Sequence, residues 1–353
     1  ESLLQLVNDE PNSISLVTVS SQADASELIA EQAKLSEVSQ VSGEVTNFSG
    51  KIERDWWLSS FTALSRNLRH VGVSSPDRDN SLEKLSGTDH QSSTMQARSL
   101  LRFNLAKGAH TGNLLHDILE DTDFNEPDWL QAMHRPLQKY GALTTGYGSE
   151  DLQLWLEQAL NSPLTHSILL AGNEQSFSLA DLHKVKTLRE SEFYYPMCSA
   201  STDKLTNLLS KHRNMHSKST QQSNVRLPAY NQLKGMMHGF IDLIFEHDNK
   251  YYICDYKSSH LGNDFSDYNY QAMKDNIEKN HYDLQYLIYS LALHRYLSYS
   301  LENYDVKTHF GGAYYLYLRG MTDEEQHKGC GVYYREIHVE ELEELDQLFL
   351  GAQ

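Results

Sequence analysis

The feature that most constrains the fold is a pair of strand-like runs joined by two turn-forming residues, GFIDLIFEHDNKYYICDYKSS over residues 239–259. Ile, Leu, Phe and Tyr dominate both runs, which is typical of strands buried on both faces of a sheet. Asp248–Asn249 is a chemically reasonable two-residue hairpin turn. Each run nevertheless contains an aspartate among apolar neighbours, Asp242 and then Asp255, and Lys257 follows two residues later.

This turn predicts which residues of the two strands pair. The numbers of paired residues sum to 497, so Asp242 lies opposite Asp255, with Cβ atoms roughly 4.5–5.5 Å apart. The strand's period of two puts Lys257 on the same face. Two buried carboxylates repel each other, and a hard divalent cation, Mg²⁺ or Mn²⁺, would relieve that cost. The alternative is an ordinary Asp–Lys ion pair on an exposed hairpin, which the apolar residues on both faces disfavour.

The distribution of charge keeps a nucleic-acid partner open despite a net charge of -18. The two ends, residues 1–55 and 336–353, account for -13 of it. Between Lys204 and Ile241 there is no acidic residue. Either a solvated basic loop or a surface that contacts phosphates through residues such as Lys211 and Arg213 would explain this stretch. Charge alone does not decide between them.

The order of the predicted elements indicates an α/β or mixed α+β domain, a central sheet flanked by helices. Residues 1–54 are expected to be a linker or the tail of a preceding domain, and residues 55–353 the folded domain. Helices are predicted after Ser59 or Ser60 and at 111–124, 151–164, 282–299 and 338–351, and strands at 190–198, 239–247, 250–257 and 309–320. Residues 74–97 are expected to be a surface loop.

Several absences bound the expected activity and location. The chain contains no GxxxxGK[ST] motif, so as given it should not hydrolyse ATP. No run approaches 18 apolar residues, and the amino terminus lacks the regions of a signal peptide. Three widely spaced cysteines suggest reduced thiols in the cytoplasm and argue against a cysteine zinc site. Because the chain begins with Glu1 rather than Met, we expect a processed chain or a fragment.

Five blocks in order resemble the carboxy-terminal nuclease domain of the RecB family, which belongs to exodeoxyribonuclease V. The blocks are WWLSSFTALSR (56–66), KGAHTGNLLHDILEDTDF (107–124), GFIDLIF with YYICDYKSSHLG (239–262), YDLQYLIYSLALHRYL (282–297) and HFGGAYYLYLRG (309–320). The resemblance implies a restriction-endonuclease-like PD-(D/E)XK fold. One departure is SSHLG, where the family often has Asn and Trp after the lysine, so that His260 would alter a DNA contact.

The resemblance also implies roles for individual residues. The metal ligands would be His116, Asp242, Asp255 and the backbone carbonyl of Tyr256, and Lys257 would be the catalytic lysine. The supporting or DNA-contacting residues would be Gln285 and Tyr289, four apart on one helix, together with Glu192 of ESEFYYP, Lys211 and Arg213. Tyr251, Tyr268 and Tyr270 are candidates to stack on single-stranded bases, with core packing as the alternative.

The implied function is a Mg²⁺-dependent DNA nuclease, with Mn²⁺ as a possible substitute, in an ATP-dependent helicase-nuclease of double-strand break repair and recombination. Its partners would be linear duplex ends, single strands, and RecC-like and RecD-like subunits of a heterotrimer. The main alternative is a non-catalytic DNA-binding or docking module with a nuclease-like fold. A zinc site at His212 and His216 lacks a third ligand, and an iron–sulfur cluster would need a fourth cysteine.

Overall fold

The computed structural model describes residues 57–66 and 100–350, except 142, 145, 165–176, 216–224, 226 and 228–232. Its strands are β1 (Trp57–Ser59), β2 (Thr187–Ala200), β3 (Leu233–His247), β4 (Lys250–Lys257), β5 (Phe310–Tyr317) and β6 (Val332–Arg335). Its helices are α3 (Phe61–Arg66), α4 (Leu101–Asn104), α5 (Ala109–Asp121), α6 (Trp129–Tyr140), α7 (Ser149–Leu160), α8 (Thr202–Met215), α9 (Tyr270–Asn280), α10 (Tyr282–Ser300), α11 (Val306–His309) and α12 (Val339–Leu350).

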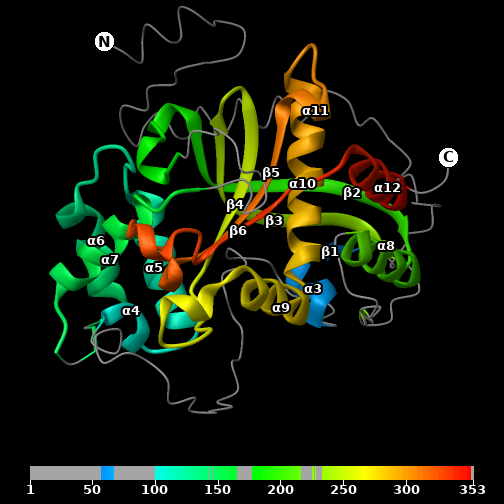
Figure 1. Ribbon diagram of the computed structural model, residues 1–353. Helices are drawn as coiled ribbons and strands as arrows, with labels where there is room; N and C mark the ends of the chain where they lie inside the picture. Colours follow the sequence, from blue (N-terminus) through cyan, green and yellow to red (C-terminus); the bar gives the residue numbers. More distant parts are fainter. Residues whose placement is uncertain are drawn as a thin grey trace, which may run out of the picture. The chain divides into compact units, whose positions relative to one another are not determined.

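All six strands form one mixed sheet with β3 as its organising strand (Figure 1). Along one edge of β3 runs the antiparallel β2. Along the other edge, β1 pairs in parallel with Gly235–Met237, and β4 pairs antiparallel with Leu243–His247. The sheet continues through β5, parallel to β4, and β6, antiparallel to β5. The predicted fold class, a mixed sheet flanked by helices, is confirmed.

The hairpin of β3 and β4 has the register expected from the sequence. Asp248 and Asn249 both have positive φ, 49° and 62°, which the tight right-twisted hairpin turn requires and which Asp and Asn tolerate. The pairs run from His247 opposite Lys250 to Leu243 opposite Cys254. The ladder ends there, one position before the predicted pair of Asp242 and Asp255. Between Met237 and Leu243, neither β1 nor β4 pairs with β3 in the described chain, so Asp242 lies where the two neighbouring strands separate.

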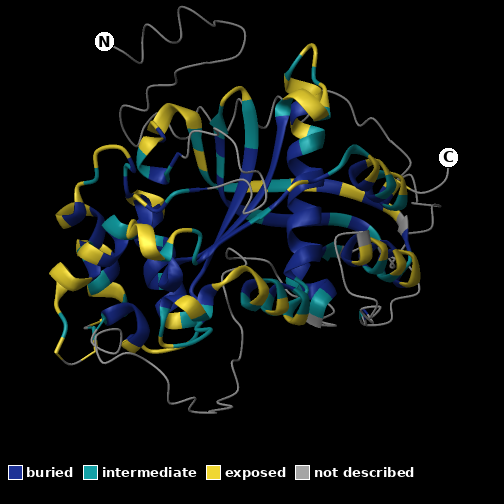
Figure 2. Ribbon diagram, viewed as in Figure 1, coloured by how far each residue is buried: buried dark blue, intermediate teal, exposed yellow. Residues whose placement is uncertain are grey.

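Two apolar cores cover the two faces of the sheet. One contains residues of α3, α8, α9, α10 and α12 with Ile253 and Tyr315 of the sheet. The other contains residues of α4, α5, α6 and α7 with Cys254 and Tyr314. Adjacent residues of β4 and β5 therefore enter opposite cores, as the strand period requires. Helix α10 is buried along Tyr282–Leu293, which Figure 2 shows as an almost continuous dark-blue helix.

Some elements differ from the sequence prediction. Trp57–Ser59 forms a short strand that was not predicted. The helix predicted after Ser59 or Ser60 follows it as α3, with Ser60 Oγ accepting a hydrogen bond from the amide of Ala63 at 3.2 Å. Of the two alternatives for the basic stretch, the solvated loop is wrong over Thr202–Met215, which is helix α8. The predictions for residues 1–54 and 74–97 lie outside the described residues. No helix in the described ranges is both long and apolar enough to cross a bilayer.

Candidate active site

Asp242 takes over part of the hydrogen bonding between β3 and β4. Its Oδ2 accepts a hydrogen bond from the backbone amide of Tyr256 at 2.8 Å, where a regular ladder would use a carbonyl oxygen. The carboxylate is buried, and burial works to raise its pKa. The positive charges of His116 and Lys257 and the two hydrogen bonds outweigh burial and hold the pKa of Asp242 below its ordinary value. Asp242 is therefore a buried anion.

His116 reaches this carboxylate from helix α5, which precedes Asp242 by more than a hundred residues in the sequence. Leu115, Ile118 and Leu119 bury the helix against the sheet, which brings the His116 ring with them. Its Nε2 donates to the carbonyl oxygen of Tyr256 at 3.0 Å, and its Nδ1 lies 3.5 Å from Oδ2 of Asp242. Burial works to lower the pKa of His116, but nearby carboxylates, Asp242 above all, raise it to about 9. The site therefore has an excess of negative charge.

A second carboxylate, that of Glu190, joins the site from β2. One ligand atom each from His116, Glu190 and Asp242 lie within 4.8 Å of one another. The register pairs Arg189 with Leu243 and Ser191 with Ile241, so Glu190 stands opposite Asp242. Its φ of 45° is in the left-handed region that non-glycine residues rarely adopt, and such strain is concentrated at functional sites.

The structure brings Glu190 to this position, and not Glu192 of the same ESEFYYP run, which the resemblance suggested as a supporting residue. Glu192, the predicted supporting residue, lies two residues further along β2, opposite Phe240. Its carboxylate accepts hydrogen bonds from the Tyr194 hydroxyl at 2.7 Å and from Nε2 of His238 at 2.8 Å. Glu192 is outside the cluster of ligand atoms formed by the described residues. In the sequence, Glu190 is distinguished only as the first acidic residue of ESEFYYP, two positions before Glu192.

Asp255 and Lys257 form a buried ion pair on β4. Lys257 Nζ lies 2.6 Å from Oδ1 of Asp255, with both side chains almost fully buried. Two aromatic rings enclose the ammonium, Tyr282 at 3.9 Å and Tyr315 at 5.2 Å from the ring centroids. Cation–π contacts of this kind stabilise a cation most when it is removed from water. Lys257 is thus held charged at one fixed point, with Asp255 as its counter-ion.

Gln285 and Tyr289 of α10 fix the surroundings of that lysine. Gln285 Oε1 lies 3.3 Å from Lys257 Nζ and accepts from the Tyr315 hydroxyl at 2.7 Å. Gln285 Nε2 donates to the Tyr289 hydroxyl at 3.1 Å. Of the predicted pair, Gln285 thus contacts the lysine and Tyr289 supports Gln285, and both side chains are buried.

The donor set at this centre suits a hard divalent cation. Glu190 and Asp242 offer carboxylate oxygens, Tyr256 a carbonyl oxygen and His116 an imidazole nitrogen. The carboxylate and carbonyl oxygens are the ligands that Mg²⁺ and Mn²⁺ prefer. The raised pKa of His116 is consistent with a site that needs positive charge. Asp255 is not in the compact ligand cluster of the described residues, because its carboxylate binds Lys257, although its charge also raises the pKa of His116.

The residues predicted to contact DNA from the basic stretch have other partners. Arg213 is buried and donates to Asp283 from Nη2 at 2.9 Å, so its guanidinium is not presented to a phosphate. Lys211 is exposed but forms an ion pair with Glu344. The zinc alternative gains no support, since His212 binds Glu341 and Tyr286 instead, and His216 lies outside the described residues.

The tyrosines predicted to stack on bases are also committed elsewhere. Tyr268 is fully buried, so this prediction was wrong for it. Tyr251 packs against the apolar core of α10, and Tyr270 stacks on Tyr333 with ring centroids 5.2 Å apart.

The fold and the acidic centre together define the class of protein. Residues 93–350 match the PD-(D/E)XK nuclease superfamily, and the chain belongs to that superfamily. It is similar to the RecBCD enzyme subunit RecB of Haemophilus influenzae, with 34% identity over 319 residues, 87% of this chain and 24% of that protein. It is similar to the same subunit of Escherichia coli, with 33% identity over 264 residues, 73% of this chain and 20% of that protein. The resemblance to the RecB nuclease domain is confirmed, and the chain spans about a fifth to a quarter of the length of these curated relatives.

Proposed function

We propose that this chain is a divalent-metal-dependent DNA nuclease, the nuclease part of a helicase-nuclease of the exodeoxyribonuclease V type. The observation that carries the proposal is the buried Asp255–Lys257 pair next to Asp242 and His116. Burying these two charges costs several kcal/mol each, a cost that an ion pair with only a structural role would avoid by staying at the surface. A site that binds a cation and a phosphate requires such fixed, buried charges, which explains why they are present here.

Each residue has a role that follows from its position. Asp242, His116, Glu190 and the carbonyl of Tyr256 would hold the cation, with Asp255 beside them. When bound, Mg²⁺ would polarise the scissile phosphate and lower the pKa of an attacking water. Before it can act as a ligand, His116 must release its proton, so cation binding and proton release are coupled.

Lys257 would provide positive charge where the reaction develops negative charge. Its ammonium is held by Asp255, Gln285 and the aromatic rings, so no reorganisation is needed as charge grows on the phosphate. Water would displace the 3′ oxygen and leave a 5′ phosphate. The non-catalytic alternative is less favoured, because catalytic and metal-ligating residue types fill every position that the resemblance predicts.

The biological setting is part of the same proposal. The relatives are subunits of a complex named RecBCD. We therefore propose RecC-like and RecD-like partners, linear duplex ends and single strands as substrates, and a role in double-strand break repair and recombination. Three cysteines that form no disulfide are consistent with the reducing cytoplasm.

The test is cleavage of linear single-stranded DNA by the 353-residue chain in Mg²⁺. We expect Lys257→Ala and Asp255→Ala each to lose at least about a hundredfold in rate, as expected for groups that stabilise the transition state. Lys250→Ala is the matched control, since Lys250 starts the same strand but lies beside the turn, and it should cleave within about twofold of the unmodified chain. Circular dichroism would verify that all variants are folded. Equal rates for Lys257→Ala and Lys250→Ala would refute the proposal.

A further inference from the structure

An aromatic surface lies on β2 and β3 next to the acidic centre. Tyr194 of β2 stands opposite His238 of β3, and their rings stack with centroids 4.2 Å apart and an interplanar angle of 10°. The ring of Phe240 meets His238 edge to face at 5.2 Å. Tyr194 is 53% exposed, whereas His238 beneath it is buried. The outer face of the Tyr194 ring is therefore open while its inner face is supported.

The surface is held rigid by Glu192. Its carboxylate accepts hydrogen bonds from both the Tyr194 hydroxyl and His238 Nε2, which fixes the two rings relative to each other. These two hydrogen bonds, that of Tyr194 first, lower the pKa of Glu192 below its ordinary value. A tyrosine placed only to fill surface would not be fixed by two polar contacts and a stacked ring.

The strand register aligns this surface with the catalytic centre. Along β3, His238 and Phe240 precede Asp242 at intervals of two residues, and along the antiparallel β2, Glu192 and Tyr194 follow Glu190 at the same intervals. Four residues of strand span about 13 Å. That distance corresponds to about four nucleotides at the spacing of a stacked DNA strand, and to fewer when the strand is extended.

We propose that Tyr194, supported by His238 and Phe240, is a base-stacking site for single-stranded DNA whose scissile phosphate lies at Asp242. This inference rests on the proposed nuclease function and specifies how the substrate strand is held. Stacking on an aromatic ring suits any base, because every base has a π face. The carboxylate of Glu192 repels phosphates, so the strand presents its bases rather than its backbone to this surface.

The experiment measures binding of a fluorescein-labelled single-stranded oligonucleotide to the 353-residue chain by anisotropy, in EDTA so that no cleavage occurs. Tyr194→Ala should weaken binding about 5- to 150-fold, the range expected for loss of one stacked base. Tyr194→Phe keeps the ring and should bind within about twofold of the unmodified chain. Tyr299→Ala is the matched control, since Tyr299 is 93% exposed at the far end of α10.

A blunt duplex distinguishes stacking from general surface effects. Its bases are already paired and stacked, so Tyr194→Ala should change duplex binding by no more than about twofold. Equal binding of the single strand by Tyr194→Ala and Tyr299→Ala would overturn the inference, as would undetectable single-strand binding by the unmodified chain. If Tyr194→Ala lost single-strand binding but the unmodified chain did not cleave DNA in Mg²⁺, the stacking site would stand and only the proposed nuclease activity would be rejected.

Discussion

Glu190 and Asp242 depart from regular strand geometry at the same level of the sheet. The backbone of Glu190 has positive φ, and the carboxylate of Asp242 accepts the amide hydrogen bond that a carbonyl would otherwise accept. Both departures cost free energy, of the order of 1–3 kcal/mol for a residue in an unfavourable region of φ and ψ. In return, two carboxylates from different strands meet at His116.

This geometry predicts different effects for the two glutamates of β2. Glu190→Gln should weaken Mn²⁺ binding at least about tenfold, because it removes a charged oxygen from the proposed coordination site. Tenfold is a lower bound, since changes to residues that only support the ligands already cost about 10- to 100-fold in metal affinity. Glu192→Gln, two residues away on the same strand, should change the Mn²⁺ dissociation constant by less than about threefold. Isothermal titration calorimetry of both variants measures this. A larger effect from Glu192→Gln would show that the carboxylate ligand was assigned to the wrong residue.

The Tyr282 ring provides a second test at the scale of one residue. It lies 3.9 Å from Lys257 Nζ, and a buried contact of this kind contributes about 0.5–2 kcal/mol. Tyr282→Leu should therefore lower kcat/KM for DNA cleavage about 2- to 30-fold. Tyr282→Phe keeps the ring face and should stay within about twofold. If Tyr282→Phe lost as much activity as Tyr282→Leu, the hydroxyl rather than the ring would be responsible.

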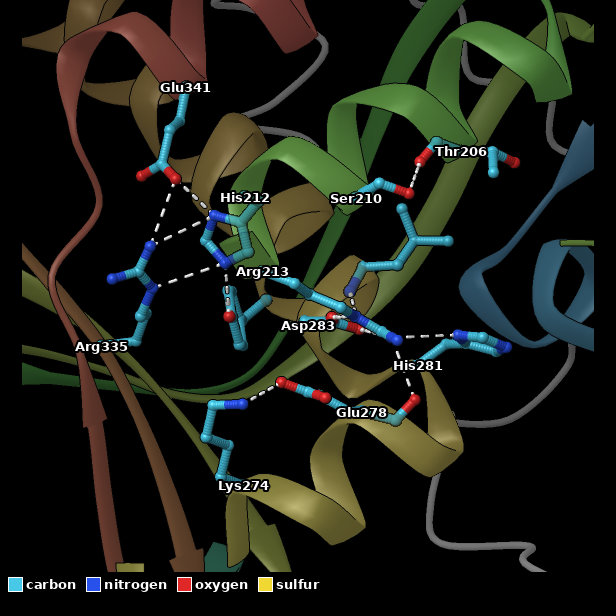
Figure 3. Close-up of polar contacts among 12 residues, drawn as sticks. Thr206, Ser210, His212, Arg213, Lys274, Glu278, His281, Asp283, Arg335 and Glu341 are labelled. Carbon is cyan, nitrogen blue, oxygen red and sulfur yellow. Dashed lines mark hydrogen bonds and ion pairs between the residues drawn. The ribbon is translucent and has the colours of Figure 1, made fainter. Parts of the chain in front are cut away.

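At the scale of elements, a buried polar network connects α8 and α12 to α10. Glu341 of α12 reaches both His212 of α8 and Arg335 of β6 (Figure 3). His212 Nε2 also contacts the Tyr286 hydroxyl at 2.6 Å. On the same helix α8, Arg213 binds Asp283 at the start of α10. Since Tyr282 and Gln285 project from this part of α10, the network positions the elements around the proposed catalytic lysine.

The network makes stability depend on pH in a defined direction. Burial works to raise the pKa of Glu341, but the hydrogen bond with His212, the charge of His212, the amide of His338 and Arg335 together lower it from 4.5 to about 2. A lowered pKa in the folded state means that the stabilisation is complete above about pH 4.5 and is lost as the pH falls toward 2.

Glu341→Gln should therefore lower the free energy of unfolding most at neutral pH. We expect a loss of about 3–5 kcal/mol at pH 7, the usual cost of breaking a buried ion pair, and a smaller loss at pH 3. Urea unfolding at both pH values measures it. Glu340→Gln, at the exposed neighbouring position, should have no comparable effect. A loss that is as large at pH 3 as at pH 7 would mean that packing, not charge, accounts for the effect of Glu341→Gln.

Local patterns were sufficient to predict some elements and not others. The hairpin register follows from its two-residue turn, and α10 from its apolar sequence, so both predictions are confirmed. Trp57–Ser59 is a strand only because it pairs with Gly235–Met237 much later in the chain, a contact that no local pattern reveals. In α8, Leu205, Leu208 and Leu209 have helical spacing, but they lie among polar and basic residues that are equally typical of a solvated loop.

At the scale of the whole molecule, the candidate site combines parts that the sequence separates widely. Asp255 and Lys257 are neighbours, and the hairpin brings Asp242 to them, so this part was predictable from the residues alone. His116 on α5 was indicated only by the resemblance, because its approach depends on how α5 packs on the sheet. Glu190 required the pairing of β2 with β3 and a positive φ, neither of which is encoded by a short motif.

This separation predicts that cation binding stabilises the fold as a whole. A ligand that binds only the folded chain stabilises it by about 2.7 kcal/mol at a concentration 100 times the dissociation constant. For a chain of this size that corresponds to a rise in Tm of about 5 °C. We expect saturating Mn²⁺ to produce such a rise in differential scanning fluorimetry, and an excess of EDTA to reverse it. His116, Glu190 and Asp242 come from α5, β2 and β3, so the cation would join three elements at once.

Asp242→Asn is the decisive variant for this last prediction. The substitution keeps the shape of the side chain and removes the charge, so Mn²⁺ should raise its Tm by less than about 1 °C, as the binding term in the free energy of unfolding disappears. Asp248→Asn is the control at the other end of the same hairpin: Asp248 is exposed in the turn, where Asn tolerates the left-handed backbone equally well. That control should show the full rise. If Asp242→Asn responded to Mn²⁺ as strongly as Asp248→Asn, the cation that stabilises the chain would bind away from the acidic centre, and the metal-dependent mechanism would lose its structural basis.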